Sequence, residues 1–274
     1  MNRFWRNISI STGIISFVFM FLGDWFWNDI IDYGLGQYYN GVINRSIFYI
    51  AVIIAVSLFF VLFENVIWYR KINFNGYKVE IRYGDLLKTH RGYPVINFDE
   101  CYSTKVGEDT GDIKPSSICG QYLLEYPISD INTLLNAANI KPERKKSEYN
   151  KNACYKPGTI LKRNNHLLMA FAKLDSKGNA QFFTREDYMN CLDYFWEQLY
   201  SIHGDSNVCI PILGTGRTKI GDSQLSRQEV LDLLLFSYLI SSYKLQKNYK
   251  LVIYCRRKDD IKLFKIFKTK YFIT

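Results

Sequence analysis

The chain has 274 residues, of which 48% are hydrophobic and 16% aromatic, and its formal net charge is +9. This length suits one ordinary domain with a membrane anchor or two small domains, and the composition excludes a largely disordered chain. The positive charge suits an anionic lipid surface or an anionic ligand. Nucleic acid is not expected as a partner, because no helix-turn-helix, zinc-finger or RNA-binding signature accompanies the charge.

Two apolar stretches near the N-terminus predict a pair of transmembrane helices. The first covers residues 8–27 and ends in a Trp-Phe-Trp run, and the second covers residues 46–69 and stops at an Arg-Lys pair. Aromatic and basic residues of this kind mark membrane interfaces. A cleaved signal peptide is the alternative for the first stretch. Bulky residues rather than a small-residue cleavage site follow it, so an uncleaved helix is expected.

The placement of basic residues predicts the orientation of this anchor. Two arginines precede the first span and Arg-Lys follows the second, whereas the loop over 24–45 has three aspartates and only Arg45. Because cytoplasmic flanks carry an excess of Lys and Arg, both termini are expected in the cytoplasm, with the loop outside. Residues 1–71 form the predicted two-helix anchor, and residues 72–274 form the predicted cytosolic domain.

Three other features carry weaker signals. Glu64, near the inner end of the second span, is either a carboxylate that reaches the headgroups or a polar contact within an oligomer. The basic stretch 141–163 is either a solvated loop or a contact with anionic lipid. The six cysteines form no C-x-x-C pair and the three histidines lie far apart, so no metal site is expected. Their apolar surroundings predict buried thiols in a reducing compartment.

Strand and helix signals alternate after a short polar link expected at residues 72–77. Strands are predicted at residues 79–83, 93–98, 159–162, 166–174, 207–213 and 251–255. Helices are predicted at residues 116–126, 129–138, 185–203 and 227–243. Capping boxes that begin at Thr184 and Ser226 mark the starts of the last two helices. The alternation predicts a three-layer α/β/α domain with a mixed sheet.

Two loops have residue types suited to ligand binding. Gly84-Asp85 directly follows the first predicted strand, where it forms either a plain turn or a carboxylate acceptor at the carboxyl end of the sheet. The run Pro-Ile-Leu-Gly-Thr-Gly-Arg at 211–217 lies between a buried strand and a capped helix. Its two glycines, with the Thr215 hydroxyl and Arg217, suit a diphosphate, although a tight turn is the alternative. The run matches neither a Rossmann nor a Walker motif.

Together, these two loops resemble the macro domain family over roughly residues 77–256. Members of that family bind ADP-ribose, and the resemblance implies that Asp85 meets the adenine amino group, with Leu86 beside it in the ligand site. It also implies that the second loop wraps the diphosphate. The matching residues of that loop are Leu213, Gly214, Thr215, Gly216 and Arg217. The expected ligand is an ADP-ribose derivative, and the resemblance implies neither a cofactor nor a metal.

The first phosphate loop of that family is divergent in this chain. A Gly-rich stretch should follow the strand at 93–98, but residues 99–115 intervene before a predicted helix begins. The loop is therefore assigned to the start of that helix, since a helix N-terminus can bind phosphate. The assigned residues are Ser116, Ser117, Ile118, Cys119 and Gly120. The tetrapeptide Asn-Ala-Ala-Asn at 136–139 is frequent in macro domains, but here it ends a predicted helix and is read as a coincidence.

Two spans followed by a divergent macro domain resemble a narrower group, the transmembrane–macro effectors of type II Thoeris anti-phage defence. The resemblance implies that a partner TIR-domain enzyme converts NAD into a signal of the histidine-ADP-ribose type. The macro domain would bind this signal without catalysis. Self-association would follow, and the membrane segments would then damage the lipid bilayer, with cell death or growth arrest as the result.

Two alternatives remain at this point. The chain is a membrane-tethered ADP-ribose or ADP-ribosyl hydrolase, or it is a structural anchor whose basic domain docks on lipid. A hydrolase needs a group that activates water beside the distal ribose. The divergent loop offers Cys119 and Gln121, with Glu108, Asp109 and Asp112 nearby, but the sequence fixes none of them in place.

Overall fold

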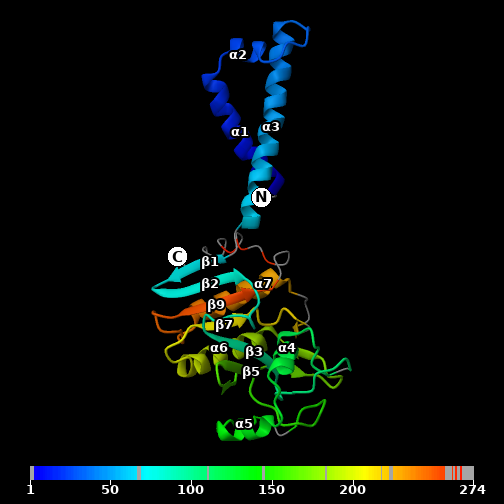
Figure 1. Cartoon of the computed structure of the whole chain (residues 1–274), viewed down its shortest axis with the longest axis vertical. Coiled ribbons are helices and arrows are strands. Elements are labelled where there is room, and N and C mark those ends of the chain that lie inside the picture. Colours follow the sequence, from blue (N-terminus) through cyan, green and yellow to red (C-terminus); the bar gives the residue numbers. More distant parts are fainter. Residues whose placement is uncertain are drawn as a thin grey trace. The chain divides into compact units, whose positions relative to one another are not determined.

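The computed structural model divides the chain into two compact units, a helical unit (Met1–Ile67) and an α/β unit (Trp68–Thr274), both drawn in Figure 1. The residues it describes are 3–66, 69–109, 111–143, 146–182, 184–216, 218–221, 225–256, 261, 263 and 266.

Three helices make up the helical unit: α1 (Arg3–Phe21), α2 (Asp24–Asp29) and α3 (Gln37–Val66). Helices α1 and α3 lie side by side, and the hydroxyls of Thr12 and Tyr49 are 3.2 Å apart between them. The buried Trp27 of α2 packs against Phe19 and Phe48, with ring centroids 4.9 and 5.2 Å away. The short helix α2 therefore closes the pair at one end.

This arrangement corrects the predicted first span of 8–27. Helix α1 ends at Phe21, and Gly23 has extended backbone before α2 begins, so the span consists of two helices rather than one. By length and composition alone, one helix of the described residues is long and apolar enough to cross a membrane, over Gln37–Phe60. The apolar helix Ile8–Phe21 is shorter, so a second transmembrane helix remains a prediction. The Glu64 side chain lies outside the described residues.

A nine-stranded mixed sheet forms the centre of the α/β unit, with strand order β1-β2-β9-β7-β3-β5-β6-β8 and β4 paired to β5. The strands are β1 (Tyr69–Phe74), β2 (Tyr77–Tyr83), β3 (Tyr93–Asp99), β4 (Ile160–Arg163), β5 (His166–Leu174), β6 (Ala180–Phe182), β7 (Val208–Pro211), β8 (Lys219–Ile220) and β9 (Lys250–Cys255). Strands β2, β9, β7, β3 and β5 pair in parallel, whereas β1, β4 and β6 join their neighbours β2 and β5 antiparallel. The five parallel strands therefore form the middle of the sheet.

Helices cover both faces of this sheet: α4 (Ile118–Glu125), α5 (Ile131–Ala137), α6 (Arg185–Ile202) and α7 (Arg227–Ile240). Leu168 and Ala170 of β5 share a buried cluster with residues of α4 and α5. Their neighbour Phe171 points to the other face, where it packs edge-on against Tyr188 of α6. Trp196 of α6 in turn contacts α7. The predicted α/β/α layers with a mixed sheet are thus present.

The elements with strong local signals match their predictions closely. Strand β5 has the predicted bounds, and α6 begins after Thr184, whose side chain accepts a hydrogen bond from the Asp187 amide. The second predicted capping box, at Ser226, is also formed. The 136–139 tetrapeptide ends α5, and Asn139 has a φ of +54°, as expected of a helix end rather than a binding loop.

The predicted polar link at 72–77 is wrong. Those residues belong to a β-hairpin in which β1 pairs antiparallel with β2, and Asn75 and Gly76 turn the chain with φ values of +49° and +87°. The burial of β1 alternates between exposed and half-buried side chains, which is the pattern of an edge strand. Strands β6 and β8 were also missed, because two or three residues are too few to show a period.

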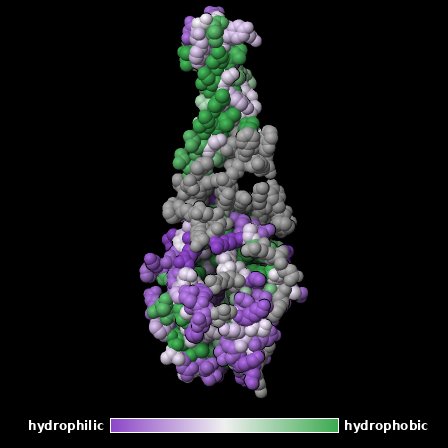
Figure 2. Space-filling view, turned by 90° about the vertical axis from the view of Figure 1, so that its right-hand side faces the viewer, coloured by the Kyte–Doolittle hydropathy of each residue, from purple (hydrophilic) through white to green (hydrophobic). Residues whose placement is uncertain are grey.

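The two units differ in the surface they present. Figure 2 shows a largely hydrophobic surface along α1 and α3 and a predominantly hydrophilic surface on the α/β unit. In the α/β unit all six cysteines are buried free thiols, in agreement with the prediction of buried thiols.

Candidate ligand-binding site

A cleft of about 800 Å³ opens at one edge of the sheet. Strands β3, β5, β7 and β9 run parallel, so their carboxyl ends meet at this edge. Residues at those ends line the cleft, among them Asn97, Asp99, Ala172, Pro211 and Tyr254. This is the edge at which open α/β sheets bind ligands, and it is where the sequence motifs point.

The turn after β7 forms one wall of the cleft through Gly214, Thr215 and Gly216. Gly214 has a φ of +90°, in the left-handed region that favours glycine. Thr215 Oγ1 donates a hydrogen bond to the Ile212 carbonyl at 2.9 Å, so this hydroxyl stabilises the turn. Leu213 is fully buried behind the wall and does not line the cleft.

The two glycines of this turn have different surroundings. A Cβ atom at Gly214 would lie 2.9 Å from Ile220 Cδ1, whereas a Cβ at Gly216 would meet no heavy atom within 4 Å. Gly214 therefore serves the turn itself, and Gly216 leaves open space at the wall. Arg217, predicted to contact the diphosphate, lies outside the described residues.

The start of α4 forms another wall. Its lining residues are Ser116, Ser117, Ile118 and Cys119. Ser117 is the N-cap of α4, and its hydroxyl accepts from the Gly120 amide at 2.9 Å and donates to the Lys114 carbonyl at 2.7 Å. The remaining first-turn amides and the helix dipole favour an anion at this end. Gly120 does not line the cleft; it packs against the Lys114 carbonyl, where a side chain would clash.

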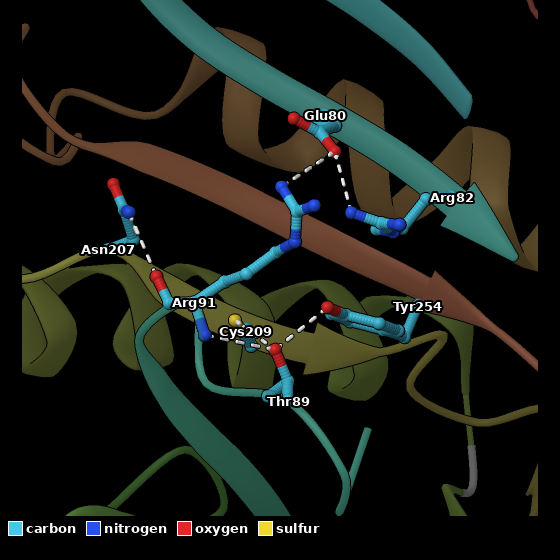
Figure 3. Close-up of polar contacts among 7 residues, drawn as sticks. All are labelled: Glu80, Arg82, Thr89, Arg91, Asn207, Cys209 and Tyr254. Carbon is cyan, nitrogen blue, oxygen red and sulfur yellow. Dashed lines mark hydrogen bonds and ion pairs between the residues drawn. The ribbon is translucent and has the colours of Figure 1, made fainter. Parts of the chain in front are cut away.

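Asp85 and Leu86 do not line the cleft. Asp85 is exposed and accepts a hydrogen bond from the Leu87 amide at 3.1 Å, while Leu86 is buried in the core. The loop that carries them is joined to the cleft by Thr89, whose hydroxyl lies 2.8 Å from Tyr254 Oη (Figure 3). Because Tyr254 is a lining residue, this loop is in contact with the wall of the cleft. The contact of Asp85 with adenine remains a prediction.

Among the described residues, three cations line the cleft: Lys114, Arg227 and Arg256. Arg256 Nη1 donates to the Ser116 carbonyl at 3.0 Å, which joins the end of β9 to the start of α4. Arg227 is the first residue of α7, so it stands at a second helix N-terminus. Cations and helix N-termini together suit the two charges of a diphosphate.

Carboxylates also line the cleft, and the environment of Asp99 bears on acid–base chemistry. Burial raises the pKa of Asp99, although hydrogen bonds from the Cys101 amide (2.8 Å) and the Ser103 amide (3.1 Å) oppose the shift. A carboxyl with a raised pKa in a cleft can serve as a general acid. Burial also raises the pKa of the Cys119 thiol well above its usual range, which disfavours a thiolate nucleophile.

Two loops at the rim meet through Tyr149, which lies in the basic stretch. Gly111 and Gly178, both lining residues with φ near +80°, each approach the Tyr149 ring so closely that a side chain at either position would clash with it. A Cβ at Gly178 would lie 2.8 Å from Tyr149 Cζ. Tyr149 therefore positions the 107–114 loop against the β5–β6 hairpin.

Sequence reasoning missed several of these residues for identifiable reasons. Asn97 and Asp99 end a predicted strand, as Tyr254 ends another, so the rule that ligands bind at carboxyl ends points to all three. Tyr149 gave no signal, because its two glycine partners lie 38 and 29 positions away in the chain.

The amino-acid sequence of this chain is similar to a known protein family. Residues 79–256 match a family model described as "Thoeris protein ThsA, Macro domain". The Thoeris protein ThsA of Bacillus amyloliquefaciens is 32% identical over 230 residues, covering 81% of this chain and 75% of that protein. The matched 81% of this chain is longer than the α/β unit, Trp68–Thr274. The similarity to that protein therefore extends into the helical unit.

Solved structures of an Oceanobacillus iheyensis macrodomain are more distant. A variant of that macrodomain has a TM-score of 0.44 and 14% identity, and covers 76% of this chain and all of its own. The same macrodomain with ADP has a TM-score of 0.41 and 14% identity, with coverage of 75% of this chain and 96% of its own.

Proposed function

This chain belongs to the family of the macro domain of Thoeris protein ThsA, and on that premise we propose that it is a membrane-attached effector whose α/β unit binds an ADP-ribose derivative. The cleft is the ligand site, and binding rather than turnover is its role. A partner TIR-domain enzyme supplies the ligand, of the histidine-ADP-ribose type, in the bacterial cytoplasm.

The observation that carries this proposal is the convergence of two helix N-termini and a glycine turn on one cleft. Helix α4, with its N-cap Ser117, and helix α7, with its first residue Arg227, begin there, and Gly216 leaves the backbone open to an approaching phosphate. Each part alone is common in proteins. Their meeting at the carboxyl edge of a mixed sheet, beside Arg256, favours a diphosphate with a sugar or base at either end.

The helical unit has the second role in this proposal. Helix α3 crosses the bacterial cell membrane, α1 crosses beside it, and both termini are cytoplasmic. Two spans in one monomer cannot enclose an aqueous path, so membrane damage requires several copies. A ligand drives such self-association only if it binds the assembled state more tightly than the monomer. The result would be cell death or growth arrest of the infected cell.

Calorimetry of the full-length protein in detergent with ADP-ribose and its derivatives tests the ligand site. Gly216→Val should abolish binding, because the valine side chain would fill the open space at the wall while leaving the left-handed Gly214 unchanged. Asp85→Ala should weaken binding about tenfold to a hundredfold, the loss of a charge-assisted hydrogen bond of ~1.5–3 kcal/mol. Unchanged affinity for both variants would remove these residues from the site.

Controls separate this result from a folding defect. Asp193→Ala, which removes an exposed carboxylate on α6, should bind as the unaltered protein does. Gly214→Val is less informative, because its φ of +90° makes any side chain there a source of backbone strain.

The observation at Asp99 supports a second candidate function, that of a membrane-tethered ADP-ribose or ADP-ribosyl hydrolase. Its raised pKa suits a general acid or base, and it lines the cleft beside Cys119. Incubation with ligand and analysis for hydrolysis products separates the two functions. Slow consumption that Asp99→Asn abolishes would support the hydrolase, and an intact ligand recovered after binding would support the effector.

A further inference from the structure

Basic side chains gather on one face of the β1–β2–β9 edge. Directly paired strand residues share a face, and the register pairs Lys71 with Glu80 and Lys78 with Lys250. Lys78, Glu80 and Arg82 alternate along β2 and so point to the same side. Of these cations, Lys71 and Lys78 are exposed and Lys250 is half-buried.

Arg91, from the loop before β3, completes this group. Arg91 Nη1 lies 3.8 Å and Arg82 Nη1 3.3 Å from the same oxygen, Glu80 Oε1 (Figure 3). The Glu80 side chain is 7% exposed and that of Arg91 54% exposed. One buried carboxylate therefore holds two guanidinium groups and neutralises the charge of one. Arg91 keeps more than half of its surface open to an external anion.

We call this group the basic strand face: Lys71, Lys78, Arg82, Arg91, Lys250 and the carboxylate Glu80. These six described residues carry a net charge of +4. None of them lines the ligand cleft. Their charge is therefore not accounted for by the diphosphate site, and it calls for a separate anionic partner.

Lys71 of this face follows the end of α3 closely in the chain. Helix α3 ends at Val66 and β1 begins at Tyr69, so Lys71 follows the helix by five residues. At ~3.5 Å per extended residue, Lys71 is at most about 17 Å from the last residue of α3. If α3 crosses the bilayer, as the proposed function holds, Lys71 lies within reach of the headgroup layer.

We propose that the basic strand face docks on the anionic headgroups of the bilayer and binds their phosphate groups. This inference rests on the membrane attachment in the proposed function. Lysine ammonium groups bind phosphate as point charges, and the exposed Arg91 guanidinium adds paired donors. Each basic residue near an anionic membrane surface contributes roughly a fivefold preference for it. Five such residues on one face hold the α/β unit against the membrane in a fixed orientation.

Lysine acetylation of the full-length protein in nanodiscs tests the docking. Discs of phosphatidylcholine alone are compared with discs that also contain phosphatidylglycerol, and the modification of each lysine is followed by mass spectrometry. Lys71, Lys78 and Lys250 should react at least about fivefold more slowly in the anionic discs. High salt should remove this protection, because it screens exposed charges. The exposed Lys177 and Lys219 serve as controls and should react equally in both discs.

Two results would overturn the proposal. Equal reaction of the three lysines in both discs would show that anionic lipid does not cover the face. Equal protection by inorganic phosphate in detergent would show a site for soluble phosphate rather than for lipid. The double variant Lys78→Glu with Lys250→Glu should lose the protection of Lys71 but keep ADP-ribose binding and resistance to alkaline extraction from membranes. Failure of the last two properties would count against the proposed function, independently of the docking.

Discussion

Large apolar side chains lie on the surface of the helical unit and in the interior of the α/β unit. Met20 of α1 is 73% exposed and Leu62 of α3 is 64% exposed, whereas Ile81, Ile210 and Ile253 of the sheet are fully buried. Apolar surface of this extent is unfavourable in water. The α/β unit closes its core against water, whereas the proposed membrane attachment would place lipid around the exposed apolar side chains of the helical unit.

Removal of residues 1–67 should have the largest effect, because it separates the properties of the two units. The remaining α/β unit should be soluble without detergent and bind ADP-ribose derivatives with unchanged affinity, because every described lining residue of the cleft lies after residue 67. Leakage of dye from liposomes should fall from its ligand-triggered level to background. Sedimentation, calorimetry and dye release measure the three properties. Leakage caused by the truncated protein would place the membrane activity in the α/β unit.

Matched truncations in the two units sharpen the comparison. Ile253→Ala, in the middle of β9, should lower the free energy of unfolding of the α/β unit by ~2–5 kcal/mol, since it leaves a cavity in a closed core. Leu58→Ala, at a 56% exposed position of α3, should leave that free energy unchanged. Denaturation in detergent, followed by near-UV circular dichroism, measures both. Equal losses would mean that Leu58 contributes to the same cooperative unit.

Tyr149 tests whether the cleft depends on its rim. Tyr149→Ala should weaken ADP-ribose binding about tenfold, or ~1.4 kcal/mol, because the loops at Gly111 and Gly178 would lose their common contact. Tyr149→Phe keeps the ring and should retain more of the affinity. Tyr200→Ala, which removes a tyrosine that does not line the cleft, is the matched control. A Tyr149→Ala protein with full affinity would show that the rim loops hold their places independently.

The smallest expected effect concerns the cap of α6. Thr184→Ala removes the hydroxyl that accepts from the Asp187 amide at 3.0 Å, and it should cost about 1 kcal/mol of α/β unit stability. Ser201→Ala, near the other end of the same helix, should cost less, because its 3.4 Å bond to the Glu197 carbonyl is long. Ligand affinity should be unchanged in both. Thermal unfolding distinguishes the two variants.

Local signals account for the parts of the fold that the sequence predicts well. The capping box at Thr184, the apolar stripe of α6 and the nine-residue β5 all depend on residues close together in the chain. The edge strand β1 was read as a link, because its hairpin follows the apolar α3 directly and its polar side chains match a loop.

The candidate site was predictable only in part, for a related reason. The turn at Gly214–Gly216 and the start of α4 have recognisable residues, and the structure places both at the cleft. Asp85 was expected there from its place after a strand and from the resemblance, but it lies in an exposed turn and is not a lining residue. The rim contact of Tyr149 joins segments far apart in sequence, so tertiary folding alone creates it.

The buried cysteines of the α/β unit leave the protein almost inert toward thiol reagents. Burial raises the pKa of Cys209 to about 11 and that of Cys255 to about 12, and no cysteine of the chain is exposed. Since a thiolate is the reactive form, the unaltered sequence already serves as a silent background for maleimide labelling. Tyr38→Cys, at the exposed second residue of α3, and Lys177→Cys, in the β5–β6 hairpin, would then report sidedness one at a time. An impermeant maleimide added to intact cells should modify the first and spare the second.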